Sequence, residues 1–115
     1  MNRVELLQRS CHHAEHAASQ DQIAQALSVL TDWTVEAGKL TRTFRFSNYH
    51  KTLAFVNAIA EIIHHEDHHP ELVVSYNRCT VRYDTHSVNA GKGGLSDNDF
   101  ICAAKIDEVF DRDFS

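Results

Sequence analysis

The hydrophobic and polar positions of the chain follow two different periods, and each period predicts one kind of element. Apolar residues within 23–30 recur at the spacing of an amphipathic helix, for which Ser19 or Asp21 is a suitable cap. Residues 40–46 alternate instead between apolar and polar side chains, which is the two-residue period of a strand. A preceding strand at 33–37 is joined to it by a short glycine-containing turn, so the pair predicts a hairpin.

The longest helical pattern extends from about Tyr49 to about Asp67. Its apolar residues form a wide stripe that should pack on the sheet: Leu53, Phe55, Val56, Ile59, Ala60, Ile62 and Ile63. Pro70 disfavours the helical conformation at the residue before it, so the helix must end at His69 or just before. The histidine-rich stretch therefore occupies the last turn and the exit of this helix.

A second hairpin and a final helix complete the predicted fold. Residues 72–76 and 79–85, rich in branched and aromatic side chains, flank a short turn. After the flexible glycine-rich loop 91–94, Ser96 and Asp99 form a capping box for the last helix. The order α-β-β-α-β-β-α, with clustered strands and one-sided helices, predicts an α+β fold. It consists of a four-stranded antiparallel sheet with helices packed on one face.

The length of 115 residues fits one domain spanning residues 1–115. The chain is 43% hydrophobic and 23% charged, so it can bury a core without disulfides or a metal. Residues 1–18 are polar, and we expect them to form a frayed terminal segment. The histidines of that segment are then solvated: His12, His13 and His16.

Charge and cysteine content narrow the classes of function. The net charge of −5 with neutral histidines argues against a nucleic-acid groove and against a polybasic membrane contact. The sequence contains neither the apolar run of a signal peptide nor one of membrane-spanning length. Cys11, Cys79 and Cys102 are far apart, which is typical of reduced thiols. We therefore expect a cytoplasmic protein.

The candidate chemistry lies in the sequence HHEDHHP at residues 64–70, of which His64 and His65 fit an exposed helix end. His68 and His69 enter the first arm of the second hairpin. Antiparallel pairing folds the end of the second arm, which carries His86, back beside them. Three converging imidazoles suit proton transfer, because near neutral pH histidine is substantially present in both protonation states.

A zinc hydrolase is a remote alternative, since His65-Glu66-x-x-His69 matches the HExxH motif. That motif needs both histidines on one helical face, whereas Pro70 ends the helix at the second one. The residues between them are charged or polar, and no third ligand follows at the metzincin spacing. A metal site is therefore not expected.

A family resemblance covers roughly Ile23 to Phe110. The run Asp67-His68-His69-Pro70-Glu71 is followed by Tyr76-Asn77, by Thr85-His86, and by Leu95-Ser96 with Asp99. This series resembles the signature of the pterin-4a-carbinolamine dehydratases, also called 4a-hydroxytetrahydrobiopterin dehydratases. Upstream, Trp33 and the alternation Leu40-x-Arg42-x-Phe44-x-Phe46 also resemble the family.

The resemblance implies a hydro-lyase that dehydrates 4a-hydroxytetrahydropterin to quinonoid dihydropterin and so recycles the pterin of aromatic amino acid hydroxylases. The pterin is the substrate, and no metal or other cofactor is implied. A homo-oligomer, dimer or tetramer, is implied, with a hydroxylase as an expected partner. The implied catalytic residues are His68, His69 and His86, and the implied substrate-binding residues are Asp67, Asp84, Thr85 and Ser87.

Within this set we expect His68 and His86 to transfer protons and His69 to bind or orient the pterin. Which of the first two is the acid and which the base stays open. Two roles stay open for Asp67 and for Asp84: the carboxylate can hold an imidazole in one tautomer, or it can be simply solvated. For Asp99 the helix cap is a sufficient role.

The chain departs from the family pattern at three places. His64 stands where the family usually has an acidic residue, and Leu72 stands where it often has tryptophan. The loop that follows His86 is also longer here. None of these departures removes a proton-transfer group, so we still expect the protein to be an enzyme.

A non-catalytic, partner-binding protein of the same fold is the alternative from a different class. Animal members of the family also bind a transcription factor, a hepatocyte nuclear factor, through its dimerisation helices. A pure binding partner has little need of three converging histidines, and therefore we favour the enzyme. Pterin binding in solution discriminates between the two.

Overall fold

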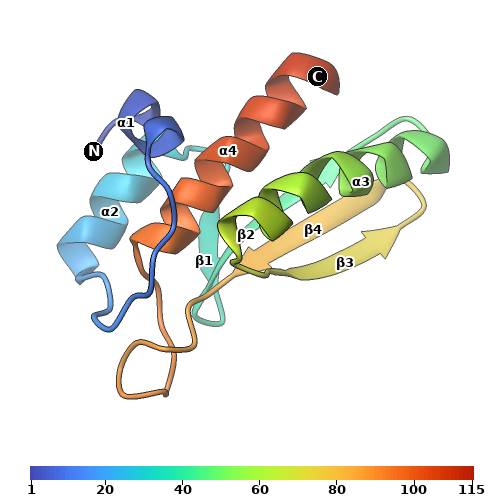
Figure 1. The fold of residues 1–115 in the computed structure, drawn as a ribbon. Helices are drawn as coiled ribbons and strands as arrows, with labels where there is room; N and C mark the ends of the chain where they lie inside the picture. The colour runs from blue at the N-terminus through green and yellow to red at the C-terminus, as the bar shows by residue number, and fades with distance from the viewer.

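A computed structural model describes residues 1–115 of the protein. The elements follow the chain as helices and strands shown in Figure 1: α1 Arg3–Gln8, α2 Gln20–Val29, β1 Thr34–Glu36, β2 Lys39–Arg45, α3 Tyr49–Glu66, β3 Glu71–Ser75, β4 Arg78–Tyr83 and α4 Asp97–Asp113. The predicted α+β class and the order of the main elements are confirmed. None of the helices combines the length and the apolar character needed to cross a membrane.

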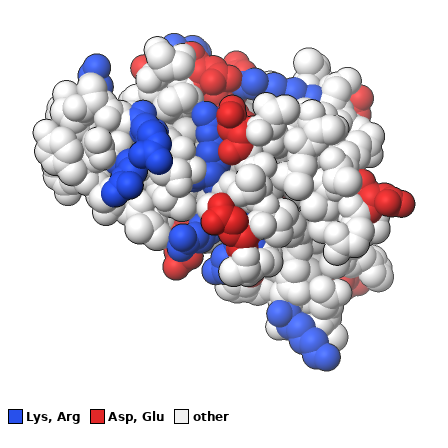
Figure 2. All heavy atoms as spheres, turned by 180° about the vertical axis from the view of Figure 1, so that it is seen from behind, with Lys and Arg blue, Asp and Glu red and all other residues white.

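The four strands form one antiparallel sheet in the order β1-β2-β4-β3. In the β3–β4 hairpin, Leu72 pairs with Val81 and Ser75 pairs with Arg78. Side chains alternate between the two faces of a strand, so Val81 and Tyr83 point into the core, while Arg82 points outward. The outer face carries charges of both signs, and Figure 2 shows basic and acidic side chains interspersed when the molecule is seen from behind.

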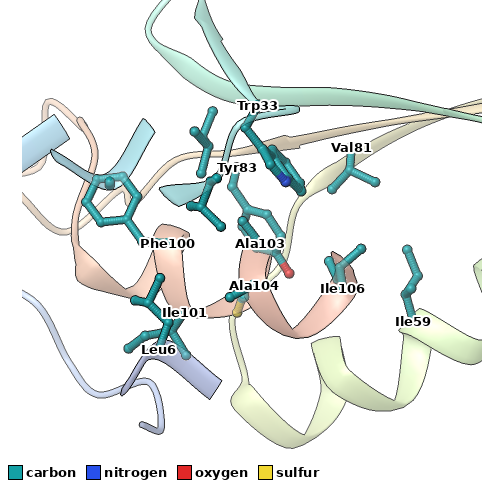
Figure 3. Packing of buried hydrophobic residues seen from close by; sticks show 14 of the residues in the cluster. Leu6, Trp33, Ile59, Val81, Tyr83, Phe100, Ile101, Ala103, Ala104 and Ile106 are labelled. Carbon is teal, nitrogen blue, oxygen red and sulfur yellow. The ribbon is translucent and has the colours of Figure 1, made fainter. Parts of the chain in front are cut away.

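The hydrophobic core lies between the sheet and the helices α3 and α4, which cover one face of it (Figure 1). Figure 3 shows side chains of α4 meeting Tyr83 and Val81 from the sheet and Ile59 from α3. Each large apolar side chain that is fully buried contributes roughly 1.5–3 kcal/mol to folding. The core therefore fixes the ends of α3, β4 and α4 relative to one another, and the polar site described below is built on those ends.

The N-terminal segment differs from the expected frayed terminus. Helix α1 begins after Asn2, whose side chain accepts a hydrogen bond from the Glu5 N–H. Its Leu6 is 1% exposed and lies beside Ile101 of α4, as Figure 3 shows. A helix of six residues is too short to produce a periodic pattern in the sequence, so only its packing on α4 reveals it. Residues 1–18 are thus partly built into the fold.

Two chain reversals place the polar residues at one end of the sheet. Helix α3 ends at Glu66, where Asp67 adopts a left-handed conformation with φ 50° and turns the chain toward β3. At the end of β4, Thr85 exchanges two backbone hydrogen bonds with Gly94, of 2.7 and 3.2 Å. The loop between them, expected to be flexible, is therefore closed at its base and buries Val88.

Candidate active site

A cavity of about 450 Å³ opens where the end of α3, the end of β4 and the start of α4 meet. The seven residues that the sequence analysis assigned to the site all line it: Asp67, His68, His69, Asp84, Thr85, His86 and Ser87. The other lining residues are Cys11, His12, His13, Ala14, Glu66 and Asn98. The cavity thus joins the predicted residues to a segment from the N-terminus.

The antiparallel register of the β3–β4 hairpin explains why the predicted residues meet. Glu71, the first residue of β3, pairs with Arg82 near the end of β4. Residues that precede Glu71 and residues that follow Tyr83 therefore leave the sheet at the same end. This is the convergence of His68 and His69 with His86 expected from the sequence.

His68 is the most enclosed of the three histidines, with a side chain 14% exposed. Its Nε2 lies 2.6 Å from Oδ1 of Asp99, and its ring stacks on that of Tyr83 with centroids 5.0 Å apart. The Tyr83 hydroxyl donates a 3.1 Å hydrogen bond to the main-chain carbonyl of His68. Both the ring and the backbone of His68 are thus held in place.

Asp99 links this histidine to the start of α4, and its side chain is fully buried. While Oδ1 faces His68, Oδ2 accepts hydrogen bonds from the Ser96 N–H at 2.9 Å and from the Thr85 hydroxyl at 3.0 Å. The capping box expected from the sequence is present. The carboxylate has a second role that the sequence analysis missed, because its two oxygens serve two different partners.

Asp99 also sets the protonation behaviour of His68. Burial acts to lower the pKa of the His68 imidazole, but the hydrogen bond and the negative charge of Asp99 outweigh it, and the pKa is raised above its ordinary value. Nδ1 of His68 makes no hydrogen bond within the protein. Every side-chain nitrogen or oxygen that is buried from solvent has a hydrogen-bond partner, so the unpaired Nδ1 is not buried. The ring therefore presents Nδ1 as its accessible nitrogen, while Asp99 holds Nε2.

His69 and His86 form an exposed rim around the cavity. The His86 side chain is 87% exposed, and its Nε2 lies 3.3 Å from Oδ1 of Asp84. The His69 side chain is 68% exposed, and its Nε2 lies 4.0 Å from Oδ1 of Asp67. Each exposed histidine therefore has a carboxylate neighbour, and the contact of His86 with Asp84 is the closer of the two.

Two of the predicted substrate-binding residues make internal contacts instead of presenting a free hydroxyl. The buried Thr85 hydroxyl shares a 2.7 Å hydrogen bond with that of Ser96 and donates to Asp99. The Ser87 hydroxyl donates to the main-chain carbonyl of Ala14. These two side chains hold walls of the cavity in position.

The geometry does not reproduce the helical arrangement of HExxH. Because α3 ends at Glu66, His65 and His69 do not share a helical face. The Glu66 carboxylate turns inward and accepts a 2.8 Å hydrogen bond from the Lys105 ammonium group. His65 points into solvent, as expected for a helix end.

Comparison with known proteins gives a consistent result. A family model described as pterin 4 alpha carbinolamine dehydratase matches residues 16–109. A Bdellovibrio bacteriovorus protein named "Putative pterin-4-alpha-carbinolamine dehydratase" is 51% identical over 115 residues, which cover 100% of this chain and 96% of that protein. A Xanthomonas campestris protein of the same name is 52% identical over 101 residues, 86% of this chain and 82% of its own length.

One solved structure is also similar. It is described as a transcriptional coactivator/pterin dehydratase from Brucella melitensis, and it is 28% identical to this chain with a TM-score of 0.73. The likeness covers 82% of this chain and 98% of the Brucella chain. The fold described above is therefore that of the solved relative.

Proposed function

This chain belongs to the pterin-4a-carbinolamine dehydratase family, and on that premise we propose that it dehydrates a 4a-hydroxytetrahydropterin. In this reaction the bond between carbon 4a and its hydroxyl oxygen breaks, and nitrogen 5 loses its proton. A double bond forms between carbon 4a and nitrogen 5, and water leaves. The product is quinonoid dihydropterin, and no electrons are exchanged with another molecule.

The observation that carries the proposal is the His68–Asp99 pair at the enclosed end of the cavity. A buried carboxylate on Nε2 fixes the imidazole tautomer and leaves Nδ1 for chemistry, as in other carboxylate–histidine pairs. The raised pKa of His68 favours the imidazolium form. We therefore assign His68 as the general acid that protonates the departing hydroxyl.

We assign the complementary role of general base to His86. Its exposed imidazole can accept the proton of nitrogen 5 and pass it to water. The carboxylate of Asp84 contacts the Nε2 atom of this imidazole. His69, next to His68 on the rim, is assigned to binding and orienting the pterin. Each general acid–base step is worth roughly 10²–10⁴-fold in rate.

The remaining predicted residues divide into two groups. Asp67 and Asp84 present carboxylates toward the cavity rim, where they can accept hydrogen bonds from the amino and ring N–H groups of a pterin. Thr85 and Ser87 are assigned as positioning residues, because their hydroxyls bond to the protein itself. The substrate reaches the site from an aromatic amino acid hydroxylase, the class of enzyme that produces the 4a-hydroxylated pterin.

The direct test follows dehydration of freshly generated 4a-hydroxytetrahydropterin, with a chelator present. Wild type should accelerate the reaction over its spontaneous rate, and the His68→Ala/His86→Ala variant should lose most of the acceleration. The matched control is His64→Ala/His65→Ala, which removes two histidines that lie outside the cavity lining. A folded wild type without acceleration contradicts the proposal, and so does a double variant that keeps it.

A partner-binding role is the second candidate, because the description of the Brucella melitensis structure names a transcriptional coactivator. Pterin binding separates the two functions, since a protein that serves only as a partner has no requirement for the ligand. The sheet edge supports the proposed homo-oligomer: β3 is an edge strand whose Val73 and Val74 are exposed. Light scattering distinguishes monomer, dimer and tetramer.

A further inference from the structure

One side of the cavity comes from a part of the chain that the family model does not match. The matched region begins at residue 16, whereas residues 11–14 line the cavity beside His68, His69 and His86. We refer to residues 11–14 as the N-terminal wall. It contributes His12 and His13 to a cavity that three further histidines also line.

Asn98 holds the wall by its main chain. The Asn98 side-chain oxygen accepts from the His12 N–H at 3.1 Å, and its amide nitrogen donates to the His12 carbonyl at 2.5 Å. Asn98 is 5% exposed, so its side chain is shielded from bulk water and depends on these two bonds. A pair of bonds to one residue fixes the orientation of the segment as well as its position.

Glu66 holds the wall at the preceding residue. Its buried carboxylate accepts from the Cys11 N–H at 2.8 Å and from the Lys105 ammonium group at 2.8 Å. Burial acts to raise the pKa of Glu66, but the bonds from Lys105 and Cys11 outweigh it, and the pKa is lowered. The carboxylate is therefore ionised at neutral pH and binds the wall with charge-assisted hydrogen bonds.

Further contacts tie the wall to the opposite side of the site. The Ser87 hydroxyl donates to the Ala14 carbonyl, so the residue next to His86 holds the end of the wall. Upstream, α1 is anchored by its buried Leu6, and downstream the Ala18 N–H donates a 2.7 Å bond to Leu95. A segment without regular secondary structure is thus specified by side chains from α3, α4 and the loop after β4.

From these contacts we propose that the N-terminal wall is part of the substrate-binding site. His12 and His13 contact the bound pterin, and Asn98 and Glu66 are positioning residues that act through the wall. The inference rests on the proposed dehydratase function and extends it to residues outside the matched family region. Buried polar side chains such as Asn98 and Glu66 are costly unless they are paired, and here the wall supplies their partners.

The test compares KM and kcat for three variants. His12→Ala/His13→Ala removes the imidazoles and leaves the main-chain bonds to Asn98 intact. Asn98→Ala removes those bonds and leaves the imidazoles. We expect each to raise KM about tenfold with kcat within about twofold of wild type, since the acid and base are untouched. The control His16→Ala changes a histidine two residues beyond the wall that does not line the cavity, and its KM should equal that of wild type.

Equilibrium binding of 7,8-dihydrobiopterin, followed by fluorescence, separates this inference from the proposed function. An active wild type together with an unchanged KM in both variants overturns the inference and leaves the dehydratase in place. An inactive wild type contradicts the proposed dehydratase activity. In that case, a higher Kd for 7,8-dihydrobiopterin in both variants than in wild type still supports the N-terminal wall as part of the binding site. A Kd equal to wild type, or no binding by wild type, overturns the inference. Asn98→Asp, which keeps the acceptor and loses the donor, should fall between wild type and Asn98→Ala.

Discussion

The enclosed end of the cavity and its exposed rim hold the same kind of side chain in opposite surroundings. At the enclosed end, His68 is 14% exposed and lies 2.6 Å from a carboxylate that has no exposure, that of Asp99. On the rim, His86 is 87% exposed and lies 3.3 Å from Asp84, which is 23% exposed. One histidine is fixed by the core, and the other is in contact with water.

The difference in exposure and in carboxylate contact supports the two roles proposed for these imidazoles, His68 as acid and His86 as base. A charge-assisted hydrogen bond in a low-dielectric site orients the ring and stabilises its protonated form. An exposed ring exchanges protons with water quickly. When a mutation removes such a ring, water can take over part of its role in proton transfer. The enclosed end therefore suits a precisely placed acid, whereas the rim suits a base that must return its proton to solvent.

The largest expected effect separates the two histidines directly. His68→Ala should lower kcat by about 10³-fold, whereas His86→Ala should lower it by about 10²-fold, near the bottom of the range for general acid–base catalysis. Water can approach the rim and serve as a weak base, but it cannot reproduce an imidazolium held by Asp99. Single-turnover rates of the two variants measure the ratio. Equal losses, or a larger loss in His86→Ala, contradict the comparison.

A smaller effect is expected when the ring stays and only its partner changes. Asp99→Asn keeps a side-chain acceptor for the Ser96 N–H but removes the negative charge beside His68. The pKa of His68 should fall, because the charge that outweighed burial is gone, and kcat at neutral pH should fall about tenfold. Titration of the ring signals by NMR measures the pKa of His68 in both proteins. An unchanged pKa would show that Asp99 does not control the acid.

The smallest effect concerns stability as a function of pH. The pKa of His68 is raised in the folded protein above its unfolded value of about 6.5, so the imidazolium–Asp99 pair contributes stability that is fully present below about pH 6.5. That contribution is lost as pH rises through the folded-state pKa. The difference in unfolding free energy between wild type and Asp99→Asn should therefore be larger at about pH 5.5 than at about pH 9. Urea unfolding at both values measures it, and a difference independent of pH refutes the pairing.

The fold was largely predictable from the sequence because its signals are local. The alternation in residues 40–46, the long stripe before Pro70 and the capping box at Ser96 each depend on neighbours a few residues apart. The convergence of His68 with His86 was also predictable, because a tight hairpin brings the outer ends of its two arms together. The family resemblance noted in the sequence is confirmed by the family model, which matches residues 16–109.

The residues that sequence reasoning missed act over long separations. Asp99 is 31 residues from His68, and Asn98 is 86 residues from His12. No periodic pattern connects such pairs, and each side chain already had a sufficient local explanation, a helix cap for Asp99 and a polar terminus for His12. The packing of α3 on α4 brings Asp99 to His68, and the packing of α1 on α4 brings the segment after α1 to Asn98. The six residues of α1, with Leu6 as the buried one, are too few to form a periodic hydrophobic pattern that would predict the packing of α1 on α4.

The register of the β3–β4 hairpin has a consequence for how this sequence can evolve. One residue inserted or deleted in either strand would shift the pairing, reverse the two faces of that strand and separate His68 from His86. The loop after β4 is closed at its base by the Thr85–Gly94 bridge, so residues can be added within it without moving that bridge. We therefore expect insertions and deletions among homologues to be common in residues 89–93, after the buried Val88, and rare in residues 71–83. The hydrogen-bonded ladder between β3 and β4 thus limits changes in chain length at the same place where it brings the proposed catalytic histidines together.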